Sequence, residues 1–372
     1  MKLTILQENF SKVLNNAQRF TSNRAQLPIL GNIHLLAEKT KLIVSSTNLE
    51  ISLSTPLGAK VEEEGEITVP SKTIFEVVSN LPPGPIELEE EKEQLKITTP
   101  SFKSTLSGMN ASDFPKVPKD MKEKTTTTLP KETFLEAVSQ VSFASSVDET
   151  RPILTGVLVL FKKDSLVLVA TDGFRLSQKR INLERVPEEG RVVIPKNILV
   201  EVVRMGVEAE KIEFSLNKKE NQVVFGLDEA TLSSRVLEGE FPNFEKIIPK
   251  ESTIKITLDK EELLRGVKLA SIFARENANI VKFLIKKETL VVFAESPSSG
   301  KQETEIEAKV ETGANLNNFE IAFNYRFLEE FLHSIKGEEI KIELNDASSP
   351  GVFMDTKDPN YLHLIMPVRI QG

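Results

Sequence analysis

The chain repeats one pattern three times, a short alternating strand followed by an amphipathic helix. In the first copy, residues 3–14, the apolar residues Phe10, Val13 and Leu14 recur at helical spacing. A second strand-to-helix unit follows each first one. The first units lie at 3–14, 127–138 and 256–267, and the second units at 67–78, 192–203 and 321–332. The period is roughly 125 to 130 residues, so each third is predicted to contain two similar halves.

Two charged, proline-bearing segments, 114–124 and 241–250, both begin with Phe-Pro and separate the thirds. A chain of 372 residues is longer than one hydrophobic core usually serves. We therefore expect an α+β fold of three repeated domains with antiparallel sheets. The expected boundaries are 1–121, 122–248 and 249–372.

Head-to-tail repetition predicts a closed ring or an open array, because each step applies nearly the same rotation. A ring leaves no sheet edge unpaired at the chain ends. If two helices per domain line the inside of a six-domain dimer, with the sheets outside, twelve helices of about 10 Å diameter enclose an opening of roughly 28 Å. Duplex DNA passes through such an opening. An open solenoid or a monomeric scaffold that binds protein peptides without DNA is the alternative.

Composition limits the classes of partner and compartment. The net charge is −8, which argues against tight binding of nucleic acid by phosphate neutralisation but not against enclosure of it. The chain has no cysteine, no apolar run long enough for a membrane span and no apolar leader at its start. We expect a cytoplasmic protein with no disulfide and no membrane partner.

Motifs of catalysis are missing from the sequence. There is no G-x-x-x-x-G-K-[ST] loop and no H-E-x-x-H, and His34, His333 and His363 are not at metal-ligand spacing, so each is interpreted as a surface or half-buried residue. We expect no catalytic residue, no metal and no cofactor. A hydrolase with Asp172 in a cleft is the competing hypothesis, although a tight turn explains that aspartate equally well.

Three local motifs, in order along the chain, resemble the family of bacterial DNA polymerase III beta subunits, the beta sliding clamps. They are Leu27-Pro28-Ile29-Leu30-Gly31-Asn32, Ala170-Thr171-Asp172-Gly173-Phe174-Arg175-Leu176 and Leu364-Ile365-Met366-Pro367-Val368-Arg369. The resemblance implies a head-to-tail homodimeric ring that encircles double-stranded DNA without sequence preference. It also implies partners, namely a replicative polymerase subunit, a clamp loader and other proteins with a Gln-Leu-x-Leu-Phe-like motif.

In this family a groove between the second and third domains holds that motif. Aliphatic and Met side chains with a few fixed polar groups suit such a peptide. Carried over position by position, the groove residues are Leu154, Thr171, Gly173, Arg175, Leu176, Pro242, Ile247, Asn324, Leu364, Met366, Pro367, Val368 and Arg369. Phe174 departs from the His or Tyr of many members, which removes a side-chain hydrogen bond from the rim. The tail Gln371-Gly372 extends past the family's usual end.

The resemblance also implies DNA contacts and a dimer interface. The DNA contacts are Arg24, Lys72, Arg151 and Lys196, and the interface contains Ser104 and Leu106 in the first domain and Ile272 and Phe273 in the third. Lys12 and Arg19 are seven residues apart, which predicts a basic stripe along one helix face.

Overall fold

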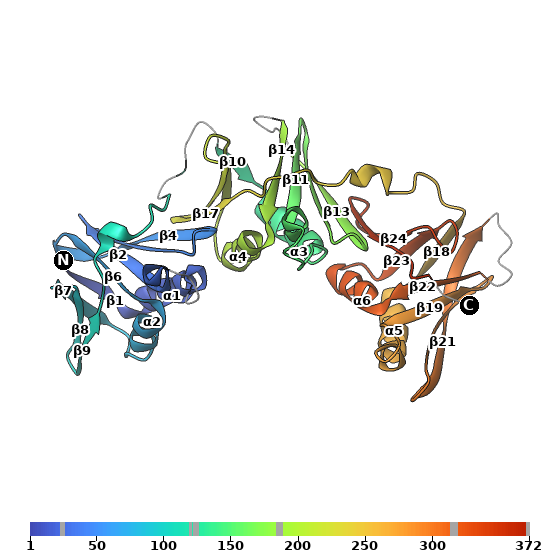
Figure 1. Cartoon of the computed structure of the whole chain (residues 1–372), viewed down its shortest axis with the longest axis horizontal. Helices are drawn as coiled ribbons and strands as arrows, with labels where there is room; N and C mark the ends of the chain where they lie inside the picture. The colour runs from blue at the N-terminus through green and yellow to red at the C-terminus, as the bar shows by residue number, and fades with distance from the viewer. Residues whose placement is uncertain (23–26, 119–120, 122–125, 184–188, 313–318, 370–372) are drawn as a thin grey trace. The chain divides into compact units, whose positions relative to one another are not determined.

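A computed structural model of the chain describes residues 1–22, 27–118, 121, 126–183, 189–312 and 319–369 (Figure 1). It forms two compact units. The first comprises Met1–Leu135 with Asn197–Val236, and the second comprises Glu136–Lys196 with Leu237–Gly372. Helices α3 (Lys131–Ser142) and α4 (Lys196–Gly206) each have residues in both units.

The first unit contains two antiparallel sheets and the helices α1 (Gln7–Ala17) and α2 (Ser71–Ser79). The five-stranded sheet runs β5-β1-β7-β8-β9 and the eight-stranded sheet runs β10-β15-β16-β17-β4-β3-β2-β6. The strands are β1 (Lys2–Leu6), β2 (Asn32–Glu38), β3 (Lys41–Thr47), β4 (Ile51–Gly58), β5 (Lys60–Glu63), β6 (Gly65–Pro70), β7 (Pro85–Glu91), β8 (Gln94–Thr99), β9 (Phe102–Ser107), β10 (Thr126–Leu129), β15 (Ile212–Asn217), β16 (Gln222–Leu227) and β17 (Ala230–Arg235).

The second unit contains one continuous antiparallel ladder of twelve strands and the helices α5 (Lys260–Ala274) and α6 (Tyr325–Ser334). The strand order is β14-β11-β12-β13-β25-β24-β23-β18-β21-β20-β19-β22. The strands are β11 (Gly156–Lys162), β12 (Ser165–Thr171), β13 (Arg175–Asn182), β14 (Gly190–Pro195), β18 (Ile254–Asp259), β19 (Ile280–Ile285), β20 (Thr289–Ser296), β21 (Gly300–Thr312), β22 (Glu320–Asn324), β23 (Glu339–Leu344), β24 (Gly351–Asp355) and β25 (Tyr361–Ile365).

The predicted strand-to-helix repeats are confirmed at all six positions. Helices α1, α3 and α5 follow β1, β10 and β18, while α2, α4 and α6 follow β6, β14 and β22. Side chains cap two of these helices: Asp259 caps α5 by accepting from Glu262 N, and Asn324 caps α6 by accepting from Arg326 N. Helix α5 buries its apolar stripe against β20 and β21, and α1 packs against α2.

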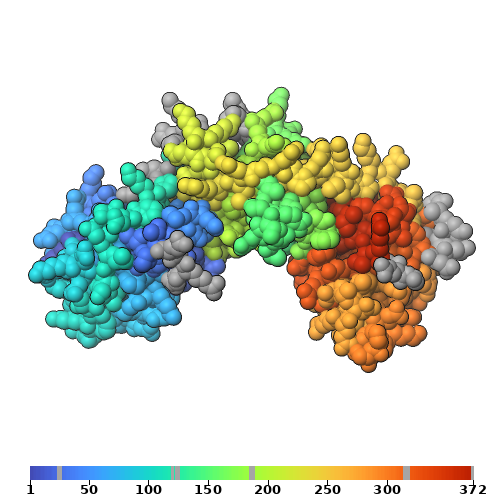
Figure 2. Space-filling view, viewed as in Figure 1, coloured from blue at the N-terminus to red at the C-terminus, as the bar shows by residue number. Residues whose placement is uncertain are grey.

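Two strand pairs join the middle third of the sequence to its neighbours. In the first unit, β17 pairs with β4 over Thr231–Ser234 and Ile51–Ser54, and Ser52 Oγ lies 2.6 Å from Ser233 Oγ. In the second unit, β13 pairs with β25 over Arg175–Lys179. In the space-filling view of Figure 2, green residues of the middle third lie beside orange and red residues of the last third. Backbone ladders therefore continue from one repeat into the next.

Candidate functional site

The predicted groove begins at the turn between β12 and β13. Thr171 Oγ1 donates to Arg175 O (2.6 Å) and accepts from Gly173 N (3.1 Å), while Asp172 Oδ1 accepts from the backbone N–H of Phe174 (2.9 Å) and of Arg175 (3.0 Å). Gly173 has a φ of +94°, which L side chains rarely adopt. These contacts fix the turn and leave the Phe174 side chain 61% exposed.

Arg175 is buried rather than a free rim cation. Its Nε donates to Asp172 Oδ2 (3.1 Å), Nη2 donates to Phe143 O (3.0 Å) and Nη1 donates to Glu330. Its guanidinium also lies over the ring of Phe327 at 4.5 Å. The resemblance assigned Arg175 to the rim, but here its charge is used to join β13 to α6.

The two faces of β13 have different roles. Alternate side chains point to opposite faces, so Leu176, Gln178 and Arg180 share one face while Arg175, Ser177 and Lys179 share the other. On the second face all three side chains are buried, and Lys179 pairs with Asp358. On the first face, Leu176 is buried in an apolar cluster.

That cluster consists of buried side chains from several segments of the second unit. Leu154, Leu176 and Leu364 are at most 5% exposed, and Met366 packs against them. Phe241 and Phe244, from the segment that follows β17, are buried in the same cluster. The sequence analysis did not assign these two rings to the groove, although they are the only aromatic residues in the proline-bearing segment 241–250.

The end of the described chain runs along this cluster. Met366 N donates to Phe174 O (2.8 Å) and Val368 N donates to Ala322 O (2.8 Å), so residues 366–368 are held at both ends and are half-buried. Pro367 lies between these two donors and needs no partner for its nitrogen. Pro242, Ile247 and Arg369 are exposed, and Asn324 caps α6.

His363 was expected to lie at the surface or to be half-buried, and that expectation is wrong. The ring is fully buried, stacked on Phe331 at 5.3 Å, and its Nδ1 lies 2.6 Å from Ser177 Oγ. Burial, with the nearby charge of Arg175, holds the pKa of His363 well below its ordinary value. The alternation of β25 carried the signal, since His363 shares a face with the buried Tyr361 and Ile365.

The residues predicted to contact DNA differ in their exposure and in their ion pairs. Lys72 is exposed, and its one ion pair among the described residues is a 3.8 Å contact with Glu76, whereas Arg151 pairs with Asp148 at 3.2 Å and approaches Gly173. Lys196 is half-buried, and burial, together with the charge of Arg175, lowers its pKa. Arg24 lies outside the described residues.

The predicted basic stripe is neutralised by carboxylates of the same unit. Lys12 pairs with Glu208 at 2.5 Å, and Arg19 pairs with the buried Glu201 at 2.8 Å. Arg19 also lies beyond the end of α1, which stops at Ala17, so the assumption of one helix face is wrong. The helical periodicity was extended past the point at which the backbone tightens to a 3-10 turn.

The predicted interface residues occupy two kinds of position. Ser104 and Leu106 lie on β9, the last strand of its sheet, with Leu106 buried. Ile272 is exposed on α5, while Phe273 packs against the core of the second unit.

The competing hypothesis of a hydrolase depends on Asp172. Both carboxylate oxygens of Asp172 are used inside the turn and its pair with Arg175, which explains the residue structurally. Among the described residues there is no group of three or more His, Cys, Asp or Glu placed to hold a metal ion. No helix among them is long and apolar enough to cross a membrane.

Comparisons with known proteins match the whole length of the chain. Residues 1–118, 128–243 and 245–369 match the N-terminal, central and C-terminal domain models of the DNA polymerase III beta subunit. A beta sliding clamp of Staphylococcus aureus (strain Mu50 / ATCC 700699) is 28% identical over 379 residues, with 99% of each chain covered.

Solved structures agree with this match. The DNA polymerase sliding clamp of Bacillus subtilis is 26% identical with a TM-score of 0.93, and the DNA polymerase III beta subunit of Thermotoga maritima is 26% identical with a TM-score of 0.91. Both comparisons cover 100% of each chain.

Proposed function

The chain belongs to the DNA polymerase III beta subunit family, and we propose that it acts as a sliding clamp, a non-catalytic processivity factor of DNA replication. As a homodimeric ring it encircles duplex DNA and tethers the replicative polymerase and other DNA-processing proteins. The observation that carries this proposal is the match of all three family domains, in order, over nearly the entire chain. We take the expected boundaries 1–121, 122–248 and 249–372 as those of its domains.

The groove is the proposed attachment point for partner proteins that carry a Gln-Leu-x-Leu-Phe-like motif, the clamp loader among them. A floor of buried apolar side chains and an apolar rim support this proposal. Leu154, Leu176 and Leu364 form the floor, and the apolar side chains of Phe174 and Ile247 are exposed. Apolar anchors seated in such a site dominate the binding energy of a short peptide. Many family members have His or Tyr where this chain has Phe174. The rim therefore has no imidazole or hydroxyl group at this position and is apolar there.

DNA is proposed to be held by enclosure with few phosphate contacts. The net charge of −8 and the pairing of Lys12 and Arg19 with carboxylates support weak contact, which sliding requires. Lys72 is the strongest of the proposed contacts because it is exposed and weakly paired. Arg24, Arg151 and Lys196 are retained as proposed contacts. A cytoplasmic location follows from this role.

The dimer is proposed to form by extension of a sheet from one copy to the other. In the first unit β9 ends its sheet, so one side of it has no strand partner among the described residues. In the second unit residues 300–307 of β21 pair with β20, whereas β18 pairs only with 308–312. The other side of residues 300–307 is therefore an edge within the described ladder. The exposed Glu303, Glu305 and Glu307 of β21 complement the charge of Lys103 of β9.

Retention on circular against linear DNA tests the proposal. The protein is loaded on nicked circular DNA by a compatible clamp loader with ATP, and the DNA is then isolated by gel filtration before and after linearisation. A clamp stays on the circle and slides off the free ends after cutting. Equal retention on both forms contradicts enclosure. No retention on either form after verified loader activity also contradicts enclosure, and it favours the peptide-binding scaffold.

A further inference from the structure

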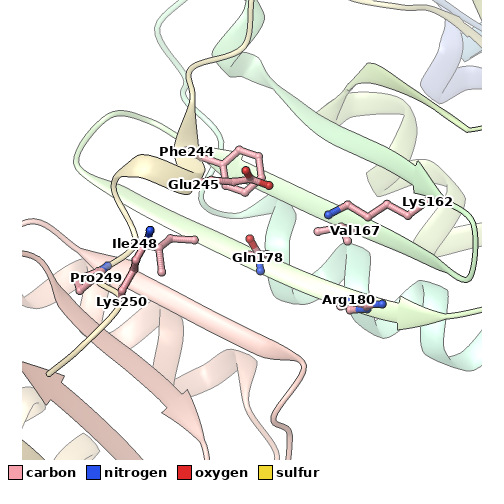
Figure 3. Close-up of a pocket in the computed structure, with 9 residues that line it drawn as sticks. All are labelled: Lys162, Val167, Gln178, Arg180, Phe244, Glu245, Ile248, Pro249 and Lys250. Carbon is pink, nitrogen blue, oxygen red and sulfur yellow. The ribbon is translucent and has the colours of Figure 1, made fainter.

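A second hollow lies on the same sheet face as the proposed groove. Its volume is about 280 Å³, and it is formed where the segment 244–250 passes over β12 and β13 (Figure 3). The apolar side chains Val167, Phe244 and Ile248 form its base, and all three belong to the cluster that floors the groove. The groove and the hollow thus share one continuous apolar layer.

The rim of the hollow is cationic in a chain that is acidic as a whole. Lys162, Arg180 and Lys250 line it, against one lining carboxylate, Glu245. Arg180 also contacts Asp164 at 3.3 Å, but Lys162 and Lys250 make no ion pair with any residue that the structure describes. The side-chain amide of Gln178 is likewise without a hydrogen-bond partner among them. Two cations and an amide are therefore available to an anionic group.

The geometry relates this hollow to the groove. Leu176, Gln178 and Arg180 alternate along one face of β13, opposite Thr171, Val169 and Val167 of β12. From Leu176 to Arg180 is four residues, about 13 Å of strand. An extended peptide that starts in the groove reaches the hollow with at least four residues, and with more where it passes over the segment 244–250.

We propose that this hollow is an auxiliary site for an acidic, partly apolar flank of the partner peptide whose anchor occupies the groove. The inference rests on the proposed function and names a feature of the partner, a carboxylate beyond the docking motif. Charge complementarity and the shared apolar layer favour this occupant. The ion pairs lie near the surface, so each contributes modestly and is weakened by salt.

The test is a fluorescence-anisotropy titration of the full-length protein with three kinds of synthetic peptide, five peptides in all. The core peptide is Gln-Leu-Ser-Leu-Phe. The second adds a six-residue Gly-Ser spacer and Glu-Leu-Glu, and the third replaces that end with Gln-Leu-Gln, each made with the flank at either terminus. We expect the acidic flank at one terminus to bind about threefold to tenfold more tightly than the amide flank, with a smaller gain at high salt.

Two variants assign the gain to the hollow. Lys162→Gln with Lys250→Gln should remove it and leave the affinity for the core peptide unchanged. The matched control, Lys219→Gln with Lys287→Gln, neutralises two exposed lysines elsewhere and should retain it. Equal affinities of the acidic and amide peptides for the unmodified protein, or an undiminished gain in the first variant, overturn the inference. Failure of the core peptide to bind at all instead refutes the groove, and with it this inference, and is seen before any flank is compared.

Discussion

The guanidinium carbon of Arg175 lies 4.5 Å from the centre of the Phe327 ring, and this contact joins the rim of the proposed groove to α6. Phe327 belongs to the last third of the sequence, whereas Arg175 belongs to the middle third. The same arginine ends the turn 171–175 and donates to Glu330. We therefore expect the shape of the proposed groove to depend on Arg175, although its side chain is buried.

Replacement of Arg175 by Gln should weaken binding of the core peptide by about tenfold, since the turn loses its attachment to α6. Phe327→Leu should have a smaller effect, and a double-mutant cycle should give a coupling of about 0.5 to 2 kcal/mol. Peptide titration gives these values. Arg191→Gln, which alters an exposed arginine of the same sheet, is the control. Unchanged affinity in the Arg175 variant contradicts the positioning role.

The repeats were predictable because their signals are local. An alternating strand followed by Phe10, Val13 and Leu14 at helical spacing needs no knowledge of the rest of the chain. The pairings of β13 with β25 and of β17 with β4 could not be derived in this way, since they join residues more than 170 positions apart. The misplaced His363 is a different case: the alternation of β25 carried a local signal for its burial, and the stack on Phe331 shows which residue covers it.

In the candidate site, too, some residues were predictable from the sequence and others were not. Leu154, Leu176 and Leu364 came from the family resemblance, and their burial in one cluster agrees with a common location. The role of Arg175 could not be predicted from the resemblance, because its partners Phe143, Phe327 and Glu330 are distant in sequence. Local spacing also misjudged Arg19, whose partner Glu201 lies in another repeat. The sequence alone could not predict the ion pairs whose two residues are far apart along the chain.

His363 should make the stability of the second unit fall as the solution is acidified. Its folded-state pKa is depressed, so below the ordinary value of about 6.5 the unfolded chain binds a proton that the folded one does not. The contribution is complete above pH 6.5 and is lost as the pH falls toward the folded pKa, at about 1.4 kcal/mol per pH unit.

Urea unfolding at pH 7.5, 6.5 and 5.5 measures this slope, with His363→Gln as the comparison. The variant keeps a hydrogen-bonding group beside Ser177 but does not titrate in this range. The difference between the two proteins isolates the contribution of residue 363. Parallel pH profiles refute the assignment.

Glu201 should contribute to the stability of the first unit, and this contribution should be lost at a lower pH than that of His363. Burial raises its pKa, but hydrogen bonds from Arg19 and Arg204 outweigh that effect, so the net pKa is lowered. Its contribution is present above the unfolded value of about 4.3 and is lost as the pH falls through the lower folded pKa.

Glu201→Gln should therefore lower the free energy of unfolding by about 1 to 3 kcal/mol at pH 7, and the deficit should shrink below pH 4. Denaturant titrations at both pH values give the two differences. Glu208→Gln removes the exposed partner of Lys12 and should change stability little at either pH. A deficit that stays constant with pH would show that the carboxylate charge is not the cause.

Ile272 provides the sharpest test of the proposed dimer. It is 57% exposed on α5, the helix that packs against β20 and β21, so an aspartate there leaves the core of the second unit intact. If this surface meets a second copy, burial of an unpaired charge opposes association. Ile272→Asp should then shift the native mass from about twice 41.6 kDa to that of one chain. Val147→Asp alters an aliphatic residue that is 91% exposed in the same unit and should leave the dimer unchanged. Native mass spectrometry across a dilution series separates the two species, and a dimer of undiminished affinity in the Ile272 variant excludes this surface from the interface.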